Sequence, residues 1–169
     1  MFDADDVLEP VGYQVHFHCV FSTKAQQALI AAELQRDVWV CIDGVARLHG
    51  MKTVAVGGAD NHCHILVSLP DNISLEEAVC LMKSGSAEWM HDFQGRDDFA
   101  WQKGYGAFSL GPSDIPALTQ TILDQAEFHK TVDYQTEFLA LLKKVIDGVQ
   151  SCLVETVLYR SFVGVMSQV

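Results

Sequence analysis

The sequence predicts an α+β fold, in which a single domain has helices on one face of an antiparallel β-sheet. The chain has 169 residues, which suits one domain with a sizeable core. Segments in which apolar residues alternate with period two are interleaved with segments in which they recur at helical spacing. The predicted order is β-α-β-β-α-β followed by helices, which is the split β-α-β, ferredoxin-like arrangement.

The first strand and the first helix are predicted from the opening third of the chain. Residues 13–22 alternate, and one face carries the apolar side chains of Tyr13, Val15, Phe17, Cys19 and Phe21. Residues 25–48 then carry apolar residues near helical spacing, and Gly50 suits the end of that helix. A strand followed by a helix is therefore expected up to residue 50.

A β-hairpin is predicted next. Residues 51–56 and 62–69 are short apolar runs, and residues 57–61 between them contain two glycines and two turn-prone polar residues. Two strands that are joined by so short a turn pair in the antiparallel sense.

The second half of the predicted domain begins with a capped helix at residues 74–91. Ser74 is a good N-cap, and Glu77 three residues later completes a capping box. Three further elements are expected after this helix: a strand at residues 105–110 and helices at residues 114–130 and 134–146.

Both ends of the chain are predicted to lie outside this domain. Residues 1–12 form an acidic extension, and residues 13–148 form the domain itself. Residues 149–169 are apolar and β-branched, which makes them a candidate strand at an interface with a partner chain.

Composition restricts the function classes. Twenty-two acidic residues against 11 Lys and Arg give a formal charge of −11, which argues against tight non-specific binding of DNA. The cysteines are odd in number and form no C-x-x-C pair, so they are predicted to be reduced core residues. No apolar run approaches the roughly 18 residues of a membrane span, and the acidic start is unlike a signal peptide. A cytoplasmic protein without a membrane partner is expected.

The histidines of the second hairpin strand are the sharpest chemical feature. His62 and His64 stand at positions i and i+2 of a strand, so their imidazoles point the same way and could chelate one divalent cation. Two hairpin histidines without function would show the same spacing. Gln125 could supply a third ligand from the following helix, with Thr121 one helical turn before it.

Four short segments carry a family resemblance. They are residues 17–24 (Phe-His-Cys-Val-Phe-Ser-Thr-Lys), 57–67 (with Gly-Gly and His-Cys-His), 83–89 (Lys-Ser-Gly-Ser-Ala-Glu-Trp) and 99–109 (with Trp-Gln-Lys-Gly-Tyr). In this order they resemble the motifs of the REP-associated tyrosine transposases, which are relatives of the insertion-sequence single-strand transposases of the one-tyrosine HUH class. The resemblance extends from about residue 13 to residue 142.

The resemblance implies a metal-dependent reaction on DNA. In the family, two histidines and a Gln or Glu hold a divalent metal, Mg²⁺ or Mn²⁺, which polarises the scissile phosphate. A helix tyrosine attacks the phosphorus and forms a phosphotyrosine. Carried over, the metal ligands are His62, His64 and Gln125. The family also implies a homodimer that binds hairpin single-stranded DNA, with His18, Lys24, Lys83 and Lys103 as candidate DNA contacts.

The chain departs from the family at the nucleophile. Residues 119–129 match the family's helix, and Thr121 occupies the tyrosine position. A threonine alkoxide is a poor leaving group, and Thr119 and Gln120 replace the preceding basic pair. The sequence therefore predicts a cleavage-deficient relative, which is either decaying or retained to bind hairpin single-stranded DNA. Replacement of the nucleophile by Tyr105, Tyr134 or Tyr159 is the less favoured interpretation.

Two other functions remain open at this stage. The histidine pair and Gln125 could activate water in a residual metal-dependent nuclease. Alternatively, the acidic charge favours a protein-interaction module that does not bind DNA.

Overall fold

Four strands form one antiparallel sheet in the computed structural model, which describes the backbone of residues 15–149 and the side chains of residues 15–144. Their order across the sheet is β2-β3-β1-β4, and each neighbouring pair is antiparallel. The predicted fold class is therefore confirmed. The strands are β1 (His16–Ser22), β2 (Lys52–Gly58), β3 (His62–Ser68) and β4 (Gly106–Leu110).

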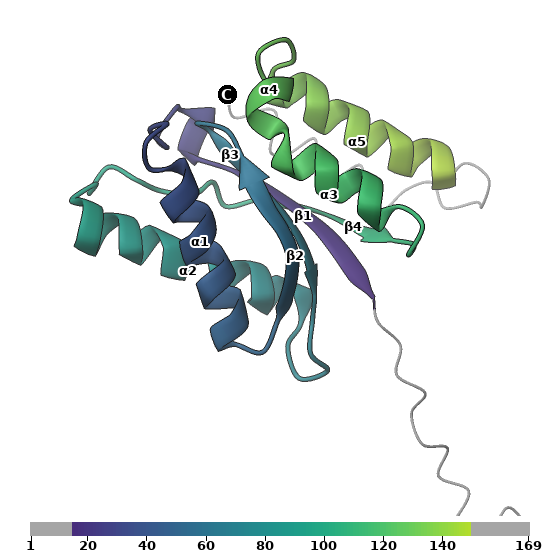
Figure 1. The fold of residues 1–169 in the computed structure, drawn as a ribbon, viewed down its shortest axis with the longest axis horizontal. Coiled ribbons are helices and arrows are strands. Elements are labelled where there is room, and N and C mark those ends of the chain that lie inside the picture. The colour runs from purple at the N-terminus through teal and green to yellow at the C-terminus, as the bar shows by residue number, and fades with distance from the viewer. Residues whose placement is uncertain (1–14, 150–169) are drawn as a thin grey trace, which may run out of the picture.

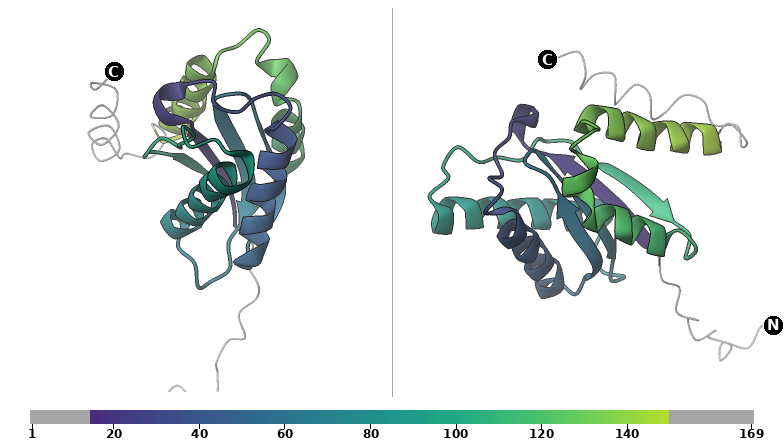
Figure 2. Two further views of the ribbon diagram at one scale, coloured as in Figure 1. Left: turned by 90° about the vertical axis from the view of Figure 1, so that its left-hand side faces the viewer. Right: turned by 45° about the horizontal axis from the view of Figure 1, so that its top comes forward.

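Helices cover both faces of the sheet, whereas the sequence analysis expected them on one face. Two long helices lie on one side, and three helices from the C-terminal part lie on the other (Figures 1 and 2). The first group is α1 (Gln35–Leu48) and α2 (Leu75–Gln94). The second group is α3 (Ile115–Leu123), α4 (Gln125–Phe128) and α5 (Tyr134–Val149).

The larger core lies between the sheet and the α1–α2 pair. Every second residue of β1 and β3 points into it, as strand geometry requires. The helices add residues at helical spacing, so the predicted alternation and the predicted helix face both hold. The buried members include Cys19, Phe21, Cys63, Ile65 and Val67 from the strands and Val38, Ile42, Ala46, Val79 and Met82 from the helices.

The opposite face of the sheet carries two smaller apolar clusters. Ile122 of α3 packs on Ala55 and Leu66 of the β2–β3 hairpin. Tyr134 and Phe138 of α5 pack on Val20 of β1. Between these clusters the sheet face carries histidines, so the C-terminal helices cover a polar strip of the sheet.

The predicted helix at residues 25–48 is wrong in its first ten residues. A short 3₁₀ turn, η1 (Lys24–Gln26), and an irregular segment precede α1. Ala25 and Gln26 lie inside this turn and both have φ near +54°, outside the right-handed helical region, so the turn does not belong to an α-helix. The segment is held inward by Ile30, which is fully buried and whose N–H donates to the Asp60 carbonyl at 2.8 Å.

The predicted helix at residues 114–130 is interrupted. The backbone of Asp124 leaves the helical region, so α3 ends at Leu123 and α4 begins at Gln125. Gln125 is buried although its neighbours Asp124 and Ala126 are exposed. The interruption therefore turns Gln125 toward the sheet.

Other predictions agree closely with the structure. The β2–β3 hairpin is antiparallel. The Ser74 hydroxyl accepts the Glu77 N–H at 3.2 Å at the start of α2, and Gly95 with φ +62° follows its end. Within the described part of the chain all cysteines are free, but only Cys19 and Cys63 lie in the core, since Cys41 is half-buried and Cys80 is exposed. The described helices include none that is long and apolar enough to cross a membrane. The predicted segment 1–12 lies outside the described residues, and so does the predicted segment 149–169 apart from Val149, which ends α5.

Candidate metal centre

The two histidines of β3 lie side by side on the sheet face that α3, α4 and α5 cover. The β1–β3 register places His62 opposite Ser22 and His64 opposite Val20. Both imidazoles are buried, with exposed fractions of 0% and 1%. The strand spacing therefore does what the sequence predicted: it aims two imidazoles at one point above the sheet.

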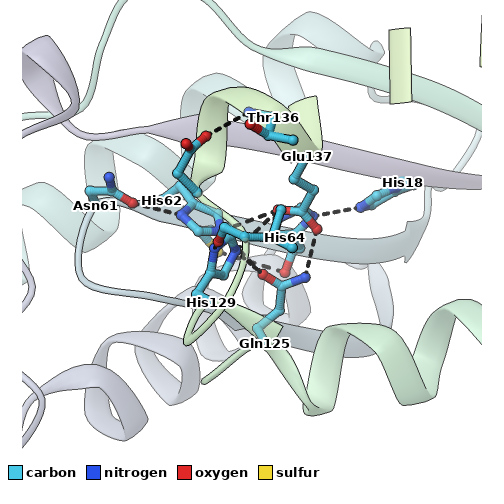
Figure 3. Close-up of polar contacts among 11 residues, drawn as sticks. His18, Asn61, His62, His64, Gln125, His129, Thr136 and Glu137 are labelled. Atoms are coloured by element: carbon cyan, nitrogen blue, oxygen red, sulfur yellow. Dashed lines mark hydrogen bonds and ion pairs between the residues drawn. The ribbon is translucent and has the colours of Figure 1, made fainter. Parts of the chain in front are cut away.

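Three side chains from the C-terminal segment meet these imidazoles (Figure 3). The amide oxygen of Gln125 lies 3.2 Å from His62 Nε2. One carboxylate oxygen of Glu137, Oε2, lies 3.1 Å from His64 Nε2 and 3.1 Å from His129 Nε2. Donor atoms of the three histidines and Glu137 all lie within 4.8 Å of one another. The arrangement is a compact cluster of metal-ligating groups.

Each imidazole of the cluster also has a hydrogen-bond partner at Nδ1, the ring nitrogen that faces away from the cluster. His62 Nδ1 lies 2.7 Å from the Asn61 Oδ1, and His129 Nδ1 lies 2.6 Å from the Val132 carbonyl. His64 Nδ1 lies 2.9 Å from His18 Nε2, and the His18 ring is stacked on that of His64. Hydrogen bonds at Nδ1 fix each ring so that its Nε2 points into the cluster.

Burial controls the protonation of this region. It lowers the pKa of His18 to about 3, with a further lowering by His64. It also lowers the pKa of His62 to about 3, together with the neighbouring imidazole of His64. Burial raises the pKa of Glu137, but the hydrogen bond and charge of His64 and the amide of Gln125 outweigh it and lower the pKa to about 2. At neutral pH His18 and His62 are therefore neutral, and Glu137 is a carboxylate.

These pKa shifts predict that the metal-free protein loses stability between pH 7 and pH 5. The unfolded chain protonates His18 and His62 near pH 6.5, whereas the folded chain keeps both neutral. The unfolded state thus binds more protons in this pH range. At pH 5 each of the two histidines therefore lowers the free energy of unfolding by about 2 kcal/mol. Urea denaturation in the presence of a chelator at both pH values measures the loss. His18→Asn should remove about half of the pH dependence, and equal unfolding free energies at pH 7 and pH 5 would contradict the prediction.

Gln125 and Thr121 have different surroundings although the sequence places them one turn apart. Gln125 is buried in the cluster, and its amide N–H donates to Glu137 Oε1 at 2.8 Å. Thr121 is exposed, and its hydroxyl donates to the Ala117 carbonyl at 3.0 Å. Because the helix is interrupted at Asp124, the side chains of Thr121 and Gln125 point in different directions. Only Gln125 reaches the histidines.

The three lysines that were candidate DNA contacts form no hydrogen bond or ion pair with the described residues of the cluster. Lys24 is exposed in η1, and Lys103 is exposed in the loop before β4. Lys83 is half-buried, and its ammonium donates to the carbonyls of Gln102, Lys103 and Gly104. These bonds use its three protons to hold the loop at residues 102–104. His18 is buried behind His64, where it orients the imidazole of a candidate ligand.

One tyrosine does lie beside the cluster. The Tyr134 ring stacks on His62 with centroids 4.7 Å apart, and burial raises the pKa of its phenol to about 12. The phenol is buried and forms a hydrogen bond with Ser22. A phenol in this position packs the site and is poorly placed to act as a nucleophile. Tyr105 packs against the larger core, and Tyr159 lies outside the described residues.

Sequence reasoning missed two members of the cluster, His129 and Glu137. His129 ends the stretch at residues 119–129 that matches the family's helix, so its place in that motif was an available signal. Glu137 lies in α5 with no local pattern that marks it. Only the fold of the C-terminal segment brings its carboxylate above β3.

Comparisons with known proteins were made for the sequence and for the fold. The family model "Transposase IS200 like" matches residues 11–125. No curated protein matches the chain. A crystal structure of a putative transposase from Deinococcus radiodurans R1 is 17% identical, covers 69% of this chain and 94% of its own, and has a TM-score of 0.54. A REP-associated tyrosine transposase bound to a REP hairpin is 16% identical, covers 70% of each chain, and has a TM-score of 0.52. The fold is thus that of known transposases, and the chain belongs to the IS200-like transposase family.

Proposed function

We propose that this chain is a transposase-derived protein that binds hairpin single-stranded DNA and does not cleave it through a phosphotyrosine. The family match over residues 11–125 supports a DNA partner. The structural neighbour in complex with a REP hairpin supports the hairpin form of that partner. The observation that carries the loss of cleavage is the exposed Thr121 at the position of the family's tyrosine, with its hydroxyl bonded to the backbone of its own helix.

The surroundings of the cluster support the same proposal. A residual hydrolase would need an open metal position where water meets the scissile phosphate. Here Glu137 lies between His64 and His129, and both imidazoles contact the same carboxylate oxygen at 3.1 Å. The carboxylate fills the space in which a phosphate oxygen would approach the cation. We propose that His62, His64 and Gln125 still contribute to binding a divalent metal, which serves the folded structure.

The covalent step is tested with a labelled hairpin that carries a single-stranded flank, incubated with the protein and Mg²⁺ or Mn²⁺ and analysed under denaturing conditions. We expect no protein–DNA adduct from the natural chain, since no described tyrosine is both exposed and beside the histidines. An adduct on any tyrosine would contradict the proposal. Nicking without an adduct, lost in His64→Ala, would support the nuclease alternative instead.

Thr121→Tyr is the informative companion variant. It restores a phenol at the family position on an exposed turn of α3. If loss of the nucleophile were the single defect, this variant would form the adduct. We expect no adduct, because the carboxylate of Glu137, which comes from α5, already contacts the imidazole of His64.

Binding is expected to be weak and to depend on few phosphate contacts, because the chain carries a net charge of −11. Fluorescence anisotropy across a salt series measures it. Lys24→Gln should lower the slope of log K against log salt by about 1, as expected for the loss of one phosphate contact. Lys52→Gln, an exposed lysine on β2, is the matched control and should leave the slope unchanged. No binding even at low salt would favour the protein-interaction module.

The family resemblance also supports a homodimer. β2 and β4 are the edges of the described sheet, and each has one unpaired side in the single chain. Light scattering coupled to size-exclusion chromatography of the full chain tests the oligomeric state. A monomer at micromolar concentration would contradict this part of the proposal.

A further inference from the structure

We propose that His62, His64, His129 and Glu137 form a closed four-donor site for a transition metal of the Zn²⁺ class, which fastens the C-terminal helices to the sheet. The inference rests on the proposed function in one respect, since both take the histidine pair of β3 as metal ligands. It differs in the ligand set, in the metal and in the role of that metal.

The spacing of the donor atoms fits tetrahedral coordination. Bonds of about 2.0–2.1 Å from Zn²⁺ to N or O place neighbouring ligand atoms about 3.3 Å apart. Glu137 Oε2 lies 3.1 Å from His64 Nε2, 3.1 Å from His129 Nε2 and 3.7 Å from His62 Nε2. These three separations scatter around the tetrahedral value, and all four donor atoms lie within 4.8 Å of one another, so one cation could draw them together.

The hydrogen bonds behind the rings make two of these nitrogens electron-pair donors. The Val132 carbonyl can only accept, so His129 Nδ1 carries the proton of a neutral ring and Nε2 carries the lone pair. The Asn61 amide donates through Nδ2 to the Gln26 carbonyl at 3.4 Å, which leaves its Oδ1 to accept from His62 Nδ1. The Nε2 atoms of both rings therefore point lone pairs into the cluster.

The atoms that face these lone pairs are acceptors too. The Gln125 amide is fixed by its donation to Glu137 Oε1, so its Oε1 is the atom that lies 2.7 Å from His129 Nε2 and 3.2 Å from His62 Nε2. Glu137 Oε2 approaches the same nitrogens. Lone pairs that converge without protons between them repel one another, and a buried cation turns this repulsion into coordination.

The donor set selects the metal. Mg²⁺ prefers oxygen ligands and keeps several waters, whereas three imidazoles and one carboxylate suit Zn²⁺ and its transition-metal neighbours. The site is also largely closed: His62 and His64 are buried, Glu137 is 8% exposed, and the side chain of His129 is 11% exposed. Zinc sites with four protein ligands are structural, while catalytic ones keep a position open.

The four ligands come from β3 and from the C-terminal segment. His62 and His64 lie within residues 11–125, which the family model matches. His129 and Glu137 lie beyond that match, at the end of α4 and in the first turn of α5 (Figures 1 and 3). The imidazole of His129 and the carboxylate of Glu137 close over the histidine pair on β3, so a metal ion bound by all four groups would join β3 to α5.

Cobalt substitution reports the geometry without any assay of activity. The full-length protein is stripped with a chelator and titrated with Co²⁺ and then with Zn²⁺. One equivalent of Co²⁺ is expected to give the intense visible bands of tetrahedral coordination, and one equivalent of Zn²⁺ should abolish them. Millimolar Mg²⁺ should not compete. Failure to bind, weak octahedral bands or displacement by Mg²⁺ would each overturn the proposal.

Matched variants test the added ligands. Glu137→Gln keeps the shape of the side chain and removes its charge, and it should weaken Zn²⁺ binding by more than about 100-fold, because even outer partners of metal ligands contribute 10- to 100-fold. Glu127→Gln, an exposed carboxylate that pairs with Lys130, is the control and should bind as the natural protein does. His129→Gln is the second ligand variant, in case circular dichroism shows Glu137→Gln to be unfolded. Natural affinity in a folded ligand variant would overturn the four-donor site.

The outcomes separate this inference from the proposed function. Metal binding is measured on the protein alone, and DNA binding is measured by anisotropy. A protein that binds hairpin DNA but no zinc would overturn the inference and leave the proposed function standing. A protein that binds zinc tetrahedrally but no DNA would do the reverse.

Discussion

Zinc is expected to raise the melting temperature of the chelator-stripped protein by roughly 10 °C. A ligand present at 1,000 times its dissociation constant stabilises the folded state by about 4 kcal/mol, and each kcal/mol corresponds to about 2–4 °C for a chain of this size. The effect should be large because the ligands join β3 to α5, and an unfolded chain does not hold them together. Scanning calorimetry of the stripped and reloaded protein measures it.

The shift should disappear in one variant and persist in another. Glu137→Gln removes a ligand, and its melting temperature should respond little to zinc. Glu127→Gln leaves the cluster intact and should show the full shift. An equal shift in both variants would mean that zinc stabilises the protein at some other place.

The described side chains of α5 make a small apolar contact with the sheet, so a metal link there would matter. Among these side chains, Tyr134 and Phe138 are buried against Val20, with partly buried neighbours at Phe108, Leu141 and Leu142. The α1–α2 face buries a much larger cluster. Because hydrophobic stabilisation scales with buried area, the described part of α5, residues 134–144, depends more on its polar contacts than α1 and α2 do.

The sheet and the histidine pair could be predicted because strand geometry leaves no freedom. Side chains alternate with a period of two, so Phe17, Cys19 and Phe21 had to share a face, and His62 and His64 had to share another. The glycines and polar residues at positions 57–61 indicated a hairpin, and this hairpin sets the register of β2 and β3.

The rest of the site could not be predicted from local patterns. Glu137 is separated from His64 by 73 positions and joins it only after α5 folds over the sheet. The break at Asp124, which turns Gln125 inward, lies in a stretch that reads as a continuous helix. The irregular segment before α1 likewise depends on a tertiary contact, the hydrogen bond from Ile30 to Asp60.

The placement of α3 depends on one glycine, and Gly57→Ala is expected to destabilise the protein by about 3 kcal/mol, at the upper end of the usual cost of overpacking. A Cβ on Gly57 would lie 2.2 Å from the Ile122 carbonyl oxygen and 3.1 Å from Cγ2 of the same residue. The clash is with backbone, so it is relieved only if α3 moves away from β2. That movement would also displace Gln125, which lies three residues after Ile122, and should weaken metal binding.

Gly44→Ala is the matched control for this glycine. Gly44 lies in the exposed middle of α1, and a Cβ there meets no atom within 4 Å. Alanine in a helix interior is more stable than glycine by about 0.5–1 kcal/mol, so this variant should gain stability by that amount. Urea denaturation of both variants, with zinc titrations alongside, checks the pair. Equal stability of Gly57→Ala and the natural protein would mean that α3 does not rest on β2 as closely as the Ile122 carbonyl indicates.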